Sequence, residues 1–91
     1  MRGTALIVDD AHATGVYGER GSGLAERFGV ERRAVAIVST CGKALGLSGA
    51  FVAGPAVLIE YLVNRARPFI FSTALPPLLL RAIGLALDLV E

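Results

Sequence analysis

The sequence contains no tryptophan, one cysteine, one histidine and one lysine. A single cysteine excludes a disulfide within the chain, and a free thiol is typical of a reducing compartment, so we expect a cytoplasmic protein. Nine basic and eight acidic residues are scattered along the chain and give a net charge of +1. This distribution does not indicate a basic surface of the kind that binds nucleic acid or an anionic membrane. We therefore expect neither as a partner.

Long hydrophobic runs are also missing, although the chain is rich in apolar residues. Hydrophobic residues make up 54% of the 91 positions, and the mean hydropathy is +0.62. Prolines and charged residues interrupt every apolar run before it reaches the ~18–20 residues that a membrane-spanning helix needs, so we expect a soluble protein. A domain of this length usually hides less apolar material, which indicates packing partners outside the chain.

Short β-branched runs alternate with segments of helical periodicity, which predicts an α/β fold. The expected strands are residues 4–8, 34–39, 50–53 and 69–72. The expected helices are residues 22–28, 55–65 and 77–91. We expect the first two strands to be buried on both faces, the third to return antiparallel to the second, and the last helix to be buried on most sides. The fold class is therefore part of a mostly parallel sheet with flanking helices.

Glycine is concentrated in residues 15–23, where it occupies four of nine positions. Such a density excludes the interior of a helix or strand and predicts a loop that lies close to another part of the molecule. The glycines of the chain match neither of two nucleotide-binding sequence patterns. A Walker A loop at Lys43 would need Ser or Thr where Ala44 stands, and a dinucleotide fingerprint starting at Gly21 would need glycine where Glu26 stands.

Polar residues follow the first two expected strands: Asp9, Asp10 and His12 after one, Lys43 after the other. In layered α/β folds, ligands bind beyond the carboxyl ends of the strands. A lysine near a carboxylate and an imidazole is the set that binds an aldehyde cofactor as a Schiff base, because the amine attacks the carbonyl while the carboxylate keeps a pyridine nitrogen protonated.

Two other interpretations of these residues stay open. Asp9, Asp10 and His12 suit several divalent metals, but the chain has no second histidine, so a complete site would have to borrow ligands and we expect none. The other interpretation is structural: one aspartate caps a turn, and His12 bonds to the backbone.

These residues lie within three longer motifs: VDDAHATGVYGERGSG, STCGKALGLSGAFVAG and NRARPFIFSTALPP. In this order the motifs resemble the α-oxoamine synthase family of pyridoxal-phosphate (PLP) enzymes, within the fold-type-I aminotransferase superfamily. The similarity runs from Ala5 to the end of the chain. It implies that residues 1–91 are an internal part of the PLP-binding large domain, with an upstream region and a C-terminal small domain outside the chain.

Carried over to the matching positions, the resemblance implies a role for each polar residue. Lys43 would form the Schiff base with PLP, and Asp9 would pair with the pyridine nitrogen. His12 would donate a hydrogen bond to the phenolic oxygen of the cofactor, and Thr40 would bind its phosphate. A further pair, Ser72 and Thr73, would reach the phosphate or substrate of the neighbouring subunit in a homodimer.

The third motif is most similar to the branch of the family that joins L-alanine to a pimeloyl thioester with loss of carbon dioxide, in biotin biosynthesis. The resemblance thus implies a PLP-dependent acyltransferase whose partners are an amino acid and an acyl-CoA or acyl-carrier-protein thioester. Sister branches, of the glycine C-acetyltransferase, 5-aminolevulinate synthase and serine palmitoyltransferase types, share the first two motifs more than the third. The other alternative is a non-catalytic α/β fragment that serves as an interaction module. We expect the 91 residues alone to lack complete activity.

Overall fold

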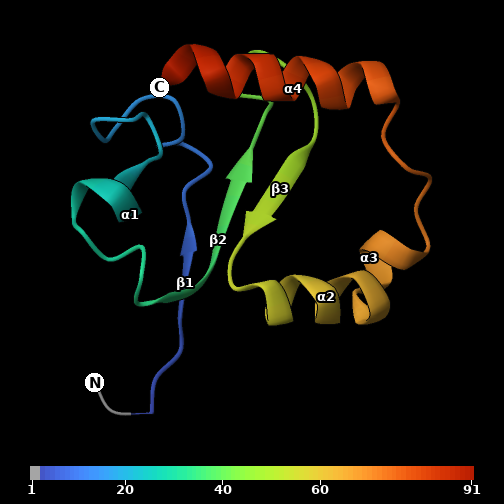
Figure 1. Ribbon diagram of the computed structural model, residues 1–91, viewed down its shortest axis with the longest axis horizontal. Helices are drawn as coiled ribbons and strands as arrows, with labels where there is room; N and C mark the ends of the chain where they lie inside the picture. The colour runs from blue at the N-terminus through green and yellow to red at the C-terminus, as the bar shows by residue number, and fades with distance from the viewer. Residues whose placement is uncertain (1–2) are drawn as a thin grey trace.

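A three-stranded sheet lies at the centre of the computed structural model, which describes residues 3–91 (Figure 1). The strands are β1 (Leu6–Asp9), β2 (Ala34–Thr40) and β3 (Ala50–Ala53). The helices are α1 (Leu24–Arg27), α2 (Ala56–Arg65), α3 (Arg67–Ile70) and α4 (Pro77–Val90). The strand order is β1-β2-β3, with β1 parallel and β3 antiparallel to β2. The predicted antiparallel return of the third strand is therefore confirmed.

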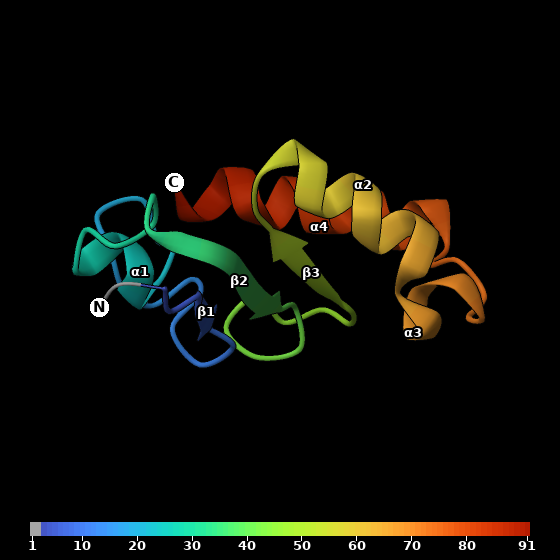
Figure 2. The same ribbon diagram turned by 90° about the horizontal axis from the view of Figure 1, so that it is seen from below.

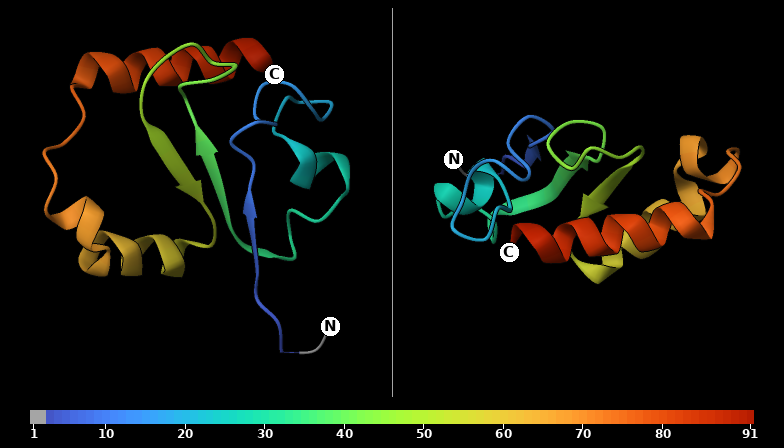
Figure 3. Two further views of the ribbon diagram at one scale, coloured as in Figure 1. Left: turned by 180° about the vertical axis from the view of Figure 1, so that it is seen from behind. Right: turned by 90° about the horizontal axis from the view of Figure 1, so that it is seen from above.

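The helices surround the sheet without forming complete layers on it. Helix α4 crosses the end of the sheet at which β1 and β2 finish, whereas α2 and α3 lie toward the opposite end (Figures 1 and 3). Seen from below, α1 and α3 mark the two ends of the long axis of the molecule, with the strands between them (Figure 2). The carboxyl ends of β1 and β2 consequently lie together, at the end of the sheet that α4 crosses (Figure 1).

The predicted helices at residues 22–28, 55–65 and 77–91 are confirmed, with ends that follow the expected chemistry. Pro55 and Pro76 immediately precede α2 and α4, where a fixed φ suits the first turn. Gly29 follows α1 with φ +67°, the left-handed conformation that ends a helix. None of the helices within residues 3–91 is long and apolar enough to cross a membrane.

The predicted strand at residues 69–72 is wrong, because this segment belongs to α3 and the turn that follows it. Pro68 occupies the first turn of α3, and Phe71 donates its N–H to the carbonyl oxygen of Arg67 at 3.0 Å. A proline fits the first turn of a helix at no cost but removes a hydrogen bond from a strand. A short apolar run alone does not distinguish the two structures, and the proline decided this one.

The buried core consists of small side chains around the ends of β1 and β2. Its apolar members are Ala11, Ala13, Ala25, Ala36 and Cys41. Its polar members are Asp10, Thr14 and Ser39. The packed part of the chain therefore lies directly beneath the polar strand ends.

Two expectations about burial are wrong. Strand β1 is not buried on both faces, since Ile7 is 65% exposed. Helix α4 has no buried residue, and Leu78 and Leu89 are 81% and 86% exposed. Both elements touch the rest of the described chain on one side only, so large apolar side chains that would be hidden in a closed domain remain exposed.

Gly84 lies in the interior of α4, and no atom lies within 4 Å of the position that a methyl group would take there. We expect Gly84→Ala to raise the free energy of unfolding by about 0.5–1 kcal/mol, because alanine loses less backbone entropy in a helix. Urea unfolding followed by circular dichroism measures this. As a contrast, Gly49→Ala should destabilise the chain, since Gly49 has φ +100° and its methyl group would lie 3.2 Å from Leu75 Cδ1. Equal stability of the two variants would contradict the assignment.

Candidate functional site

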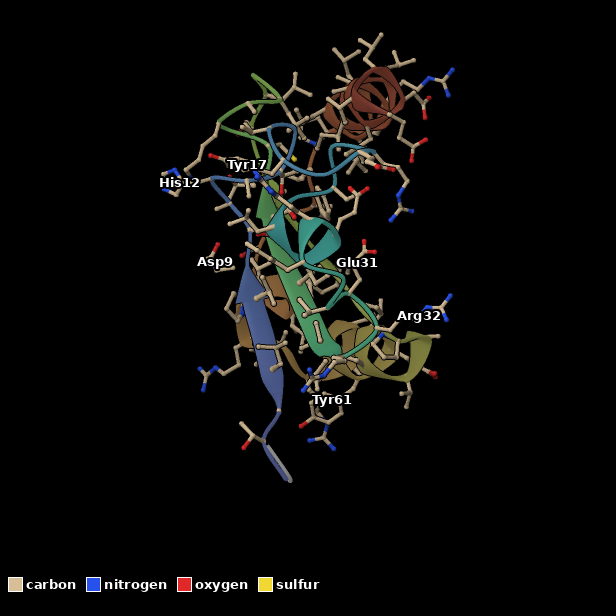
Figure 4. All side chains as sticks on the ribbon, turned by 90° about the vertical axis from the view of Figure 1, so that its left-hand side faces the viewer. Asp9, His12, Tyr17, Glu31, Arg32 and Tyr61 are labelled. Atoms are coloured by element: carbon tan, nitrogen blue, oxygen red, sulfur yellow. The ribbon has the colours of Figure 1, made fainter. Side chains whose placement is uncertain are left out.

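The two aspartates at the end of β1 point in opposite directions. Asp9 is exposed, and its Oδ1 accepts a hydrogen bond from the N–H of Ala11 at 3.0 Å. Asp9 and His12 lie on the side of β1 that faces away from α1 (Figure 4). Asp10, by contrast, is only 2% exposed and reaches α1. This opposition follows from the alternation of side chains along a strand.

Asp10 caps α1 from a distance in the sequence. Its Oδ1 accepts from the N–H of Leu24 at 3.2 Å and its Oδ2 from the N–H of Ala25 at 3.1 Å, while the preceding Gly23 has no side chain to do so. A carboxylate in this place satisfies two of the free N–H groups of the first turn. The prediction that an aspartate caps a turn is therefore confirmed. Asp9 is exposed and remains accessible for further contacts.

The glycine loop at residues 15–23 closes around two carboxylates, which confirms that it lies close to other groups. A methyl group on Gly23 would lie 2.5 Å from Asp10 Oδ2, and one on Gly18 would collide with the Glu26 carboxylate. Glu26 accepts from the N–H groups of Arg20 and Ser22, both at 2.9 Å. The backbone N–H of Arg20 is the main cause that holds the pKa of Glu26 below its usual value, with smaller help from Ser22 and the Arg20 side chain.

The second loop carries Lys43 and is closed at its base by the backbone of Cys41. Cys41 donates its N–H to the Gly49 oxygen at 2.9 Å and accepts from the N–H of Leu47 at 2.7 Å. The Nζ of Lys43 donates to Thr40 Oγ1 at 3.3 Å, and the lysine is exposed. The only amine-bearing side chain of the chain therefore sits beside a hydroxyl at the end of β2.

Parallel pairing brings the two strand ends to the same edge. Asp9 is the register partner of Val38, and Thr40 lies two residues further along β2, so Asp9 and Thr40 project from the same face. The two loops also touch, since a methyl group on Gly15 would lie 3.1 Å from the Cβ of Ala44. The structure thus gathers Asp9, His12, Thr40 and Lys43 at one edge of the sheet.

Ser72 and Thr73 lie apart from this cluster. They belong to the connection between α3 and α4, which runs on the far side of β3 from β1 (Figure 1). Ser72 Oγ donates to the carbonyl oxygen of Pro68. The role expected for this pair in a neighbouring subunit stays a prediction.

Sequence reasoning missed a buried contact between the two strand ends. Thr14 Oγ1 donates to the carbonyl oxygen of Asp10 at 2.9 Å, and a hydroxyl–hydroxyl hydrogen bond of 2.9 Å joins it to Ser39 Oγ. The signal in the sequence was a polar residue, Ser39, at the end of an apolar strand. Its partner Thr14 lies 25 residues away in the sequence, so the contact could not be predicted from a local pattern. Among residues 3–91, no three His, Cys, Asp or Glu side chains form a group that could hold a metal ion.

Comparisons with known proteins identify the family of the chain. The sequence model of the family "Aminotransferase class I and II" matches residues 1–89. The chain belongs to this family. The 8-amino-7-oxononanoate synthase of Geobacter sulfurreducens is 56% identical over 89 residues, which are 98% of this chain and 23% of that protein.

Solved structures of the family superpose closely on the chain. The 8-amino-7-oxononanoate synthase of Francisella tularensis matches with a TM-score of 0.81 and 40% identity, over 93% of this chain and 26% of that one. A high-resolution structure of serine palmitoyltransferase (SPT) with PLP matches with a TM-score of 0.87 and 31% identity, over 97% of this chain and 22% of that one. The chain therefore has the α/β fold of part of these enzymes and spans about a quarter of their length.

Cys41, at the base of the lysine loop, has no exposed surface, and burial raises the pKa of its thiol. A raised pKa means that the folded chain holds this proton more tightly than the unfolded chain does, so the free energy of unfolding should fall as the pH rises through the usual thiol range. We expect a smaller fall in Cys41→Ala. Urea unfolding at about pH 7 and about pH 10 measures both. Identical pH dependence in the two proteins would contradict this expectation.

Proposed function

We propose that this chain is the PLP-binding centre of an α-oxoamine synthase of the 8-amino-7-oxononanoate synthase type. The observation that carries the proposal is the position of Lys43 beside Thr40, at the sheet edge where Asp9 and His12 also lie. The 56% identity to a synthase of this type and the superposition on SPT with PLP support it.

The residues at this edge fit the groups of PLP. Lys43 offers an exposed amine for the aldehyde, and Thr40 offers a hydroxyl 3.3 Å from that amine for the phosphate. Asp9 uses one carboxylate oxygen for Ala11 and is exposed, so its second oxygen can accept from a pyridine nitrogen. His12 lies on the same side of the strand and can donate to a phenolic oxygen.

In the proposed reaction each residue has a separate task. Lys43 Nζ would hold the cofactor through its aldehyde and, as a free amine, would accept the proton from the α-carbon of the amino acid. Asp9 would keep a proton on the ring nitrogen, and His12 would orient the ring through its phenolic oxygen. When bound, PLP supplies an electron-withdrawing ring that stabilises negative charge at the α-carbon.

The proposed substrates are L-alanine and a pimeloyl thioester of coenzyme A or an acyl carrier protein. The new carbon–carbon bond joins the α-carbon of alanine to the thioester carbonyl, while the thiol and carbon dioxide leave. The 31% identity to SPT, against 56% to the synthase, supports this branch over the serine palmitoyltransferase branch. The glycine C-acetyltransferase and 5-aminolevulinate synthase types remain as alternatives for the test.

We further propose that residues 1–91 form one part of a larger domain in a homodimer. The exposed apolar side chains of α4, such as Leu78 and Leu89, support a packing partner for this helix. Ser72 and Thr73 are the residues proposed to reach the neighbouring subunit. The rest of the large domain or the second subunit would cover these surfaces.

Lys43 is the only lysine of the chain, which makes the covalent step easy to localise. We expect borohydride reduction after incubation with PLP to leave the cofactor attached to Lys43, because reduction fixes a Schiff base as a stable amine. Peptide mapping by mass spectrometry locates the adduct. The matched control is Lys43→Arg, which keeps the positive charge but cannot form the bond.

PLP attached to the N-terminal amine alone would contradict the proposal. Equal labelling of the unsubstituted chain and of Lys43→Arg would contradict it as well. The non-catalytic interaction module would then be the remaining explanation. Attachment that is weakened in Asp9→Asn would support the role of Asp9, because the amide has lost the charge that holds a proton on the ring nitrogen.

Turnover is the second test, with a thiol reagent that detects coenzyme A released from pimeloyl-CoA. We expect little release by the 91 residues alone and L-alanine-dependent release by the longest protein whose reading frame contains this sequence. In that protein Lys43→Ala should lower kcat by about 10²–10⁴-fold, the usual contribution of a proton-transferring group. Faster release with glycine and a short acyl-CoA would instead favour a sister branch.

A further inference from the structure

We propose that Asp10 is a positioning residue: its side chain is anchored to the start of α1, and through its backbone it sets the orientation of Asp9 and His12. The inference concerns a side chain that touches none of the groups assigned to the cofactor. It rests on the proposed function only for the roles of Asp9 and His12 in binding the cofactor.

The Asp10 side chain is buried and hydrogen-bonded at the end of β1. It is 2% exposed and accepts the N–H groups of Leu24 and Ala25. Gly23 closes the remaining space, because a methyl group there would lie 2.5 Å from Oδ2. These contacts hold the carboxylate in place. Hydrogen bonds to a charged group are strong, and a buried charge that lost them would be unpaired, which is costly.

The backbone of Asp10 carries this constraint to both of its neighbours. Its N–H donates to the Val38 oxygen at 2.8 Å, which extends the pairing of β1 with β2 beyond Asp9. Its carbonyl oxygen accepts the N–H groups of Ala13 and Thr14, both at 2.9 Å, and these bonds close the turn that contains His12. A shift of the Asp10 backbone that followed the loss of its side-chain bonds to α1 would therefore disturb Asp9 on one side and His12 on the other.

The same turn is linked to the lysine loop through Thr14. Thr14 Oγ1 lies 2.9 Å from both the Asp10 carbonyl oxygen and Ser39 Oγ, and Ser39 immediately precedes Thr40. Asp9 and His12 face the opposite side of β1 from α1 (Figure 4), so Asp10 acts on them through the backbone and without direct contact. The position of the β1 residues relative to Thr40 thus depends on the Asp10 contacts.

Asp10→Asn tests the proposal, because it keeps the size of the side chain but replaces one accepting oxygen with a donor. The cofactor-free readouts are the NMR signals of the His12 imidazole, the only one in the chain, and of the Ala11 N–H that bonds to Asp9. We expect both signals to move and the Ala11 N–H to exchange about tenfold faster, which corresponds to the loss of one hydrogen bond to a charge. Formation of the PLP adduct at Lys43 should weaken by a similar factor.

Ala25→Gly is the matched control. It removes a buried methyl group from α1 but leaves both N–H donors to Asp10, so it should lower stability without moving the His12 and Ala11 signals. Gly23→Ala is the second variant, for use if Asp10→Asn does not fold. It keeps the carboxylate but displaces it with a methyl group, and it should move the same two signals.

The outcomes separate this proposal from the proposed function. Movement of both signals in Asp10→Asn or Gly23→Ala, but not in Ala25→Gly, supports the positioning role. Unchanged signals in a folded Asp10→Asn overturn it, as does an equal change in Ala25→Gly. If the unsubstituted chain forms no PLP adduct at Lys43, the proposed function is wrong. The two NMR signals still decide the role of Asp10.

Discussion

The parallel pairing of β1 with β2 is the interaction on which the candidate site depends. It brings two strand ends that lie 31 positions apart in the sequence, at Asp9 and Thr40, to one edge of the sheet. The bond from the Asp10 N–H to the Val38 oxygen extends this pairing past the last residue of β1. Because parallel strands end on the same side, the loops that follow them must meet there.

Glycine allows these loops to pack against charged groups without steric conflict. The backbone at Gly23 and Gly18 passes so close to Asp10 and Glu26 that a side chain at either position would collide with a carboxylate. Each carboxylate in turn accepts two backbone N–H groups, which compensates for the loss of contact with water. The glycine-rich loop is thus a tightly packed segment. Of the two glycines that resembled the start of a nucleotide fingerprint, Gly23 approaches the Asp10 carboxylate and Gly21 approaches Val90 of α4.

Local sequence patterns predicted most of the elements, and the errors have identifiable causes. The segment at residues 69–72 was predicted as a strand because short apolar runs are ambiguous, whereas Pro68 directs it into a helix. Burial of β1 and α4 was predicted from their apolar composition, but composition cannot supply the layers that would cover them. The contact between Thr14 and Ser39 depends on strand register, which no local pattern reveals.

The sequence by itself determined which chemical groups are available: one lysine next to small residues, a pair of aspartates and one histidine at a strand end. The motif order also determined the family. Only the tertiary structure decided that Asp9 faces the accessible side while Asp10 is buried as the cap of α1. The reason is physical. Adjacent residues at the end of a strand project to opposite sides, and which side faces the solvent depends on the pairing with β2 and the position of α1.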